Sequence, residues 1–65
     1  MTTVSRVLKR LREARGLSQR ALAKRASVTG AYIAMLETGA RTQPSLPTLR
    51  KLAKALGVRV AELLE

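Results

Sequence analysis

The side chains that most often perform catalysis or bind metal ions are scarce in this sequence of 65 residues. It contains no cysteine and no histidine, which excludes thiol nucleophiles, imidazole bases and the common zinc sites. Its acidic residues are spread along the chain, without the clustering that cation binding or paired acid–base chemistry requires. They are Glu13, Glu37, Glu62 and Glu65. We therefore expect no enzyme activity, no cofactor and no metal site.

Positive charge is the chemical feature that remains. Lysine and arginine together number 13 against 4 acidic residues, which gives a net charge of +9. Such a charge on a small chain favours a polyanionic partner, with nucleic acid first and an anionic membrane surface second. The hydrophobic content of 46% is too high for a disordered basic tail. No apolar run approaches the roughly 20 residues of a membrane span, so we expect no membrane-spanning segment. The absence of cysteine fits a cytoplasmic protein.

Two stretches of the chain have the apolar spacing i, i+3, i+4, i+7, which is typical of an amphipathic helix. The helix of the first stretch is expected to end at Gly16. The helix of the other stretch is expected to begin near Pro47 and to end at Gly57. Their apolar residues are Val4, Val7, Leu8 and Leu11 in the first, and Leu49, Leu52, Ala53 and Leu56 in the second.

Three shorter helices complete the prediction. Ser18 is a good N-cap for a helix over 19–26, and Thr29 for one that ends at Gly39. The two are joined by about three residues, within the span of a helix-turn-helix. After a loop over 40–45 and the Pro47 helix, a last short helix over 60–64 is weakly capped by Arg59. The sequence predicts one compact all-α domain of five helices over residues 1–65.

The helix that follows Thr29 has two faces. Ile33 and Leu36 are expected to anchor it in the core. A helix that projects its opposite face outward can enter the major groove of DNA. The residues of that outward face are Gly30, Ala31, Ala34, Met35 and Thr38.

The order and spacing of these residues are similar to those of the lambda-repressor/Cro-like helix-turn-helix family, also called the XRE family. The resemblance runs from about Val4 to Leu64. Its motifs are Leu17-Ser18-Gln19, Leu22-Ala23, Val28-Thr29, Tyr32-Ile33, Leu36-Glu37-Thr38-Gly39, Pro44-Ser45, Thr48-Leu49, Leu52-Ala53 and Ala55-Leu56-Gly57-Val58.

The resemblance implies a DNA-binding surface and an internal ion pair. Gln19 would contact a phosphate and brace the recognition helix, and Arg12 would pair with Glu37 to tie the first helix to the third. The positions that would meet bases and nearby phosphates are Thr29, Gly30, Ala31, Tyr32 and Met35. Those that would grip the sugar–phosphate backbone are Thr38, Arg41, Thr42 and Gln43. Tyr32 is equally consistent with closing the edge of the core.

The sequence departs from the family pattern in two places. Ser27 stands where a glycine is common in the turn, a position that serine tolerates with some strain. Gly30, Ala31 and Ala34 replace residues that are often glutamine, serine, threonine or arginine. Bidentate contact with guanine or adenine requires arginine, lysine, asparagine or glutamine, so we expect direct base readout to be sparse. Apolar contact of Ala31 or Met35 with thymine methyl groups, and readout of DNA shape, would replace it.

These observations predict a sequence-specific regulator of transcription that binds double-stranded DNA, as a repressor or autoregulator. A module of this size would bind a palindromic operator as a homodimer. The expected dimer surface consists of Val58, Val60, Leu63 and Leu64. An antitoxin-like or adaptor protein, in which the same fold mainly contacts another protein, is the alternative. A cationic membrane-active peptide is a third reading, which the orderly succession of helix caps disfavours.

Overall fold

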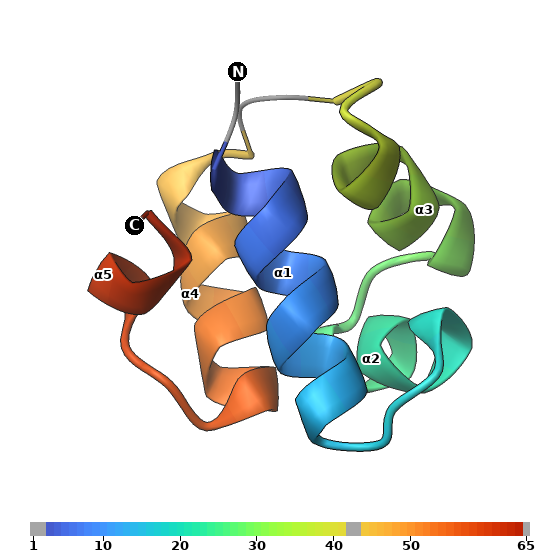
Figure 1. Cartoon of the computed structure of the whole chain (residues 1–65), viewed down its shortest axis with the longest axis horizontal. Helices are drawn as coiled ribbons and strands as arrows, with labels where there is room; N and C mark the ends of the chain where they lie inside the picture. Colours follow the sequence, from blue (N-terminus) through green and yellow to red (C-terminus); the bar gives the residue numbers. More distant parts are fainter. Residues whose placement is uncertain (1–2, 42–43, 65) are drawn as a thin grey trace.

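The computed structural model describes residues 3–41 and 44–64, and it is helical without strands over these residues. The five helices are α1 (Thr3–Ala14), α2 (Gln19–Ala26), α3 (Gly30–Thr38), α4 (Leu46–Leu56) and α5 (Val60–Leu63) (Figure 1). The predicted all-α class and the order of its helices are confirmed. Nowhere in these two ranges is a helix long and apolar enough to cross a membrane.

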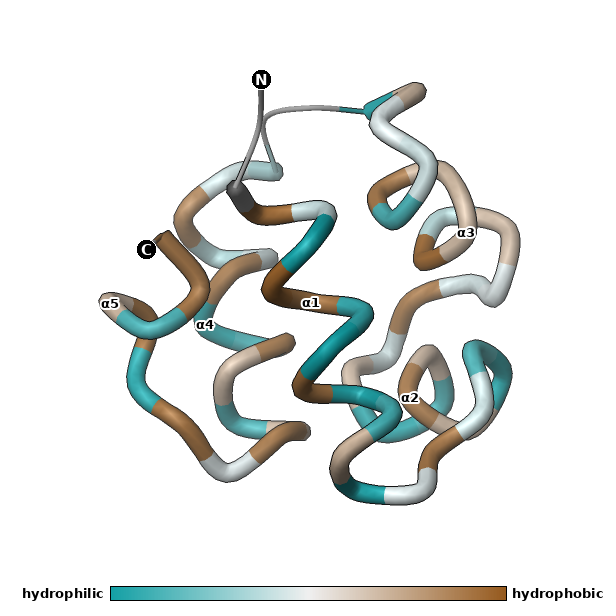
Figure 2. Tube along the Cα trace, in the orientation of Figure 1, coloured by the Kyte–Doolittle hydropathy of each residue, from teal (hydrophilic) through white to brown (hydrophobic). Residues whose placement is uncertain are grey.

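Helix α1 lies across the front of the molecule in Figure 1, with α3 and α2 to one side of it and α4 and α5 to the other. It contacts α3 and α5, while α2 packs against both α3 and α4. Along α1 hydrophobic and hydrophilic positions alternate in Figure 2, as expected for a helix with one face on the core. The buried apolar residues are Val7, Leu8, Leu22, Ala23, Ala26, Ile33, Leu36, Leu49, Leu52, Ala53, Leu56 and Leu63.

The N-termini of α2 and α3 are capped by the side chains that the sequence suggested. Ser18 Oγ accepts a hydrogen bond from the Ala21 amide at 3.0 Å, and Thr29 Oγ1 accepts one from the Tyr32 amide at 3.0 Å. These caps satisfy amides that have no partner inside the helix. At α4 the cap is Ser45, whose Oγ accepts from the Thr48 amide at 3.3 Å. The capping residues therefore fix where α2, α3 and α4 begin.

The turn between α2 and α3 is closed by a left-handed residue. Ser27 has φ 58° and is the one non-glycine residue with positive φ in the described ranges. In this conformation the Val28 amide donates to the Ala23 carbonyl at 2.9 Å, and Val28 packs against the core. The strain expected from serine at a glycine position is thus present, and the turn keeps the helix-turn-helix geometry.

The C-terminal helix differs from expectation at one residue. Leu63, which we assigned to a dimer surface, is fully buried (0% exposed) in the core of its own chain. The prediction was wrong for Leu63 because α5 packs against both α1 and α4, and its inward face must fill the space between them. Leu64 remains 55% exposed, while Val58 and Val60 are partly buried.

Candidate nucleic-acid interface

Helix α3 presents the predicted stripe to solvent. Ala31, Met35 and Thr38 are exposed, whereas Ile33 and Leu36 on the opposite side are 0% and 1% exposed. Gly30 and Ala34 are partly exposed at the borders of the stripe. Because the buried anchors hold one side of α3, the other side projects from the body and is free to contact a partner.

The exposed stripe is small and mostly apolar, as the sequence implied. An added Cβ at Gly30 would lie 3.9 Å from the Arg20 Cα of α2, an ordinary contact. The Thr38 hydroxyl donates to the Met35 carbonyl at 3.2 Å, so this side chain helps to close the end of its own helix. The stripe can offer van der Waals contact to a groove, but no bidentate hydrogen bonding to a base.

Three helices meet in one polar network beside α3. Arg12 of α1 donates from Nε to Glu37 Oε2 at 2.6 Å and from Nη2 to Glu37 Oε1 at 3.0 Å. Gln19 of α2 donates from Nε2 to Glu37 Oε1 at 3.1 Å. Arg12 Nη1 also donates to the Leu17 carbonyl at 2.7 Å. The structure therefore brings together the two residues of the implied ion pair, and it adds Gln19 to them.

The network is largely shielded from water. The side chains of Arg12 and Glu37 are 11% and 3% exposed. Burial by itself raises the pKa of the Glu37 carboxyl, but hydrogen bonds from Arg12 and Gln19 and the charges of Arg12 and Lys9 outweigh it, so that the pKa lies below its ordinary value. The pKa of Arg12 is raised, chiefly by its hydrogen bond to Glu37. Both groups are therefore charged at neutral pH, and the pair ties the end of α3 to α1.

A second contact was not predicted, and it joins α3 to the loop that follows. The guanidinium carbon of Arg41 lies 5.7 Å from the centre of the Tyr32 ring, within the range of a cation–π interaction. The Arg41 amide donates to the Met35 carbonyl at 3.1 Å. Tyr32 also packs against the core, so it closes the core edge and holds Arg41 beside α3. No spacing rule for helices relates these two residues, because Arg41 lies beyond the helix.

The structure describes only part of the remaining predicted contact residues. Thr29 is exposed at the start of α3 and caps it. Thr42 and Gln43 lie outside the described residues.

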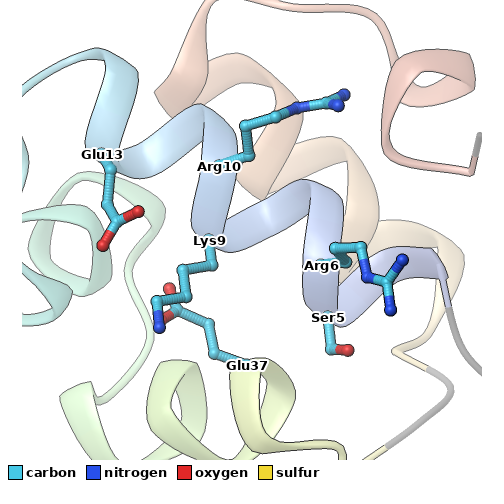
Figure 3. Close-up of a pocket in the computed structure, with 6 residues that line it drawn as sticks. All are labelled: Ser5, Arg6, Lys9, Arg10, Glu13 and Glu37. Atoms are coloured by element: carbon cyan, nitrogen blue, oxygen red, sulfur yellow. The ribbon is translucent and has the colours of Figure 1, made fainter.

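Next to the C-terminal turn of α3, a surface hollow is lined by Ser5, Arg6, Lys9, Arg10, Glu13 and Glu37. In Figure 3 the Lys9 side chain reaches toward Glu37, and Arg10 points away from it. The flank of α1 beside α3 therefore carries both signs of charge.

The sequence matches the helix-turn-helix family over residues 8–63. This chain belongs to the lambda-repressor/Cro-like helix-turn-helix family. Family membership agrees with the packing of α2 against α3 and with the solvent-facing stripe of α3. Proteins of this family are DNA-binding regulators, not enzymes.

Relatives of known role are similar to most of this helix-turn-helix chain. It is 45% identical over 58 residues to the HTH-type transcriptional regulator DdrOP3 of Deinococcus deserti, covering 89% of the chain and 44% of that protein. It is 41% identical over 59 residues to the immunity repressor protein of Bacillus phage phi105, covering 91% of the chain and 40% of that protein. The chain thus spans less than half the length of these two relatives.

A solved structure has nearly the same fold. The restriction-modification controller protein C.AhdI from Aeromonas hydrophila superposes with a TM-score of 0.90 at 37% identity. The match covers 95% of this chain and 92% of that one.

Proposed function

We propose that this chain is the DNA-binding part of a transcriptional repressor or autoregulator, and that it places α3 in the major groove of an operator. The observation on which the proposal depends is the orientation of α3. Its apolar stripe faces solvent while Ile33 and Leu36 hold it to the core and Glu37 joins it to α1. Two relatives, a transcriptional regulator and an immunity repressor, support the regulatory role. This function implies a cytoplasmic location.

The proposed contacts divide into two classes. Ala31 and Met35 would touch base edges, chiefly thymine methyl groups, because neither has a hydrogen-bonding side chain. Arg41 would meet a phosphate at the C-terminal side of α3, and Gln19 one at the start of α2. The further proposed contacts are Thr29, Gly30, Tyr32, Thr38, Thr42 and Gln43. Sequence preference would then arise from apolar contacts and DNA shape more than from hydrogen bonding.

A homodimer on a palindromic operator would supply the affinity that one small module lacks. The proposed dimer surface now excludes Leu63 and consists of Val58, Val60 and Leu64. Leu64 is 55% exposed, and Leu46 at the start of α4 is 52% exposed. Leu64 directly follows α5, which packs against α4, so its exposed side chain is available to such a surface.

In vitro selection of duplexes from a random pool tests the proposal directly. We expect an enriched inverted repeat whose half-sites are centred about one helical turn, roughly 10 bp, apart. Met35→Ala would lower affinity for the selected duplex more than for an unselected one. A pool that shows no enrichment while the protein remains folded would contradict sequence-specific binding.

A second candidate function keeps the fold and changes the partner. The outward face of α3 lacks the arginine, lysine, asparagine and glutamine side chains that read bases, which favours an antitoxin-like or adaptor protein that uses the fold mainly for protein contact. Such a protein would bind all duplexes weakly, with equal affinity and strong salt dependence. The same selection experiment therefore separates the two functions.

A further inference from the structure

The exposed stripe of α3 has no side chain that can read a base through two hydrogen bonds. Gly30, Ala31 and Ala34 are too short, and Met35 has no hydrogen-bond donor. The Thr38 hydroxyl already donates to the Met35 carbonyl at 3.2 Å. Bidentate readout in the groove that receives α3 must therefore come from a residue beside this helix.

Arg20, in the first turn of α2, lies directly against the start of this stripe. A Cβ added at Gly30 would lie 3.9 Å from the Arg20 Cα, and within the described ranges no other atom outside α3 and its adjoining residue would come within 4 Å of it. The neighbouring Gln19 donates to Glu37 Oε1 of α3 at 3.1 Å. The first turn of α2 is thus held against both the first and the last turns of α3.

The Arg20 side chain leaves α2 on the side away from the core. Successive residues of a helix are about 100° apart, so Arg20 lies about 200° from the buried Leu22. Gln19, about 100° from Arg20, is directed to α3 by its hydrogen bond to Glu37. Arg20 is exposed, and it therefore emerges beside α3 at the edge that Gly30 shares with the stripe.

The border of α3 next to Arg20 leaves room for a long side chain. Gly30 has no side chain, and Ala34, about one turn further along α3, has only a methyl group. Within the described ranges the Arg20 side chain forms no hydrogen bond or ion pair, whereas Arg12 is committed to Glu37. Arg20 therefore offers an unengaged guanidinium beside the stripe that would face the bases.

The chemistry of this group selects one base. A guanidinium donates two parallel hydrogen bonds in a fixed plane, which matches the O6 and N7 acceptors on the major-groove edge of guanine. Lys24, on the same exposed side of α2, lies about 6 Å further along that helix and carries a point charge without this fork. A guanine next to the start of α3 is therefore the base that the arrangement fits.

We propose that Arg20 of α2 reads a guanine in each half-site by donating two hydrogen bonds to its O6 and N7. The inference rests on the proposed function, since it requires that α3 enter the major groove. It adds one hydrogen-bonded base contact to the apolar contacts of Ala31 and Met35. It also assigns part of the sequence preference to α2, the first helix of the motif, in addition to the recognition helix.

Selection from a random pool, carried out in parallel with wild type and Arg20→Ala, tests this assignment. We expect the same inverted repeat from both proteins, except that a guanine fixed by wild type in each half-site is no longer enriched by the variant. Replacing that guanine by adenine in one half-site should weaken wild-type binding about 5- to 100-fold. Arg20→Ala should bind the two duplexes with equal affinity. A variant that still enriches every guanine of the wild-type repeat would overturn the proposal.

Arg25→Ala is the matched control. It removes the same charge from the same helix, but Arg25 lies near the other end of α2, where it lines a hollow toward α4 with Lys51 and Lys54. Both arginines are exposed, and circular dichroism establishes that both variants are folded. Arg25→Ala should keep the preference for the guanine. If Arg20→Ala instead weakens binding to all duplexes equally and keeps this preference, Arg20 contacts a phosphate and the proposal is wrong.

A modified base examines the hydrogen bond itself. The probe is the selected duplex with 7-deazaguanine at the assigned position, which retains base pairing and lacks the N7 acceptor. Wild type should lose several-fold in affinity for this probe, and Arg20→Ala should lose none. An equal loss in both proteins would remove Arg20 from the contact. A wild-type protein that enriches no sequence would instead reject the proposed function, because the assignment of Arg20 fails alone only when a repeat is selected.

Discussion

Arg12 and Glu37 are 25 residues apart in the sequence, yet their side chains form a two-pronged ion pair of 2.6 and 3.0 Å. The pair joins α1 to the last turn of α3, and Gln19 joins α2 to the same carboxylate. Besides its buried apolar residues, α3 is therefore held in place by a charged contact with little access to water. Removing the charge of one partner in such a pair leaves the other partner charged and poorly solvated.

The substitution Glu37→Gln should lower the free energy of unfolding by about 3 kcal/mol, since it removes the buried countercharge of Arg12. A chain of this size has only about 3–10 kcal/mol of stability in total, so the loss should be plain in urea unfolding. Arg59→Gln is the control. Its pair with Glu62 has a 4.0 Å separation and an 88% exposed arginine side chain, and should contribute less than about 1 kcal/mol. Similar losses in both variants would contradict the role assigned to burial.

The Glu37 carboxyl also predicts how the stability of the chain changes at acidic pH. The pKa of Glu37 is lower in the folded chain than its ordinary value of 4.5, so the unfolded chain binds the proton more readily. Its contribution to stability is complete above the ordinary pKa and is lost as pH falls through the folded-state pKa. In urea unfolding between pH 6 and pH 3, the gap between wild type and Glu37→Gln should narrow below about pH 4.5. A constant gap would show that protonation of Glu37 is not coupled to folding.

The turn residue offers a stabilising substitution. Ser27 has φ 58°, in a region that costs a residue with a Cβ about 1–2 kcal/mol. Ser27→Gly removes this cost, but glycine also has more conformational freedom in the unfolded chain, which offsets part of the effect. The free energy of unfolding should therefore rise by about 0.5–1 kcal/mol. Gly57, which has φ 71° with open space around it, permits the reverse experiment. Gly57→Ser should lower stability by a similar amount, and thermal unfolding of the two variants should shift in opposite directions.

Substitutions at Tyr32 test whether its contact with Arg41 contributes to DNA binding. If the ring holds Arg41 toward a phosphate, Tyr32→Leu should weaken binding to the selected duplex about 2- to 5-fold. Tyr32→Phe keeps the ring and should leave the affinity nearly unchanged. Fluorescence anisotropy at fixed salt measures both. An equal loss in the two variants would assign the contribution to the tyrosine hydroxyl instead.

The two leucines at the end of the chain differ in burial and should differ in effect. Leu63→Ala empties a fully buried site and should cost about 2–5 kcal/mol of stability. Leu64→Ala changes a side chain that is 55% exposed, so the stability of the monomer should hardly change. Under the proposed dimer, sedimentation equilibrium should show weaker self-association for Leu64→Ala. Unchanged association would remove Leu64 from the proposed interface.

Much of the fold could be predicted from sequence patterns that span only a few residues. The apolar periodicity predicted the long helices, and the hydroxyls of Ser18 and Thr29 marked where α2 and α3 begin, because caps and periodicity act within a few residues. The exposed stripe of α3 was also accessible, since Ile33 and Leu36 fix which side of the helix is buried. The cap at Ser45 was missed, although the serine stands three residues before the amide that it binds.

The sequence by itself determined the helices, their ends, the charge of the chain and the absence of cysteine and histidine, because each of these depends on residue type or short-range spacing. Tertiary structure alone decided that Leu63 is buried, that Arg41 lies against Tyr32 and that cations of α2 and α4 line one hollow. These relationships depend on how helices distant in sequence pack, and packing is set by the whole core at once. The apolar periodicity of a helix therefore shows which residues can face the core. Only the packing of the other helices determines which of them stay exposed to bind DNA or a second copy of the chain.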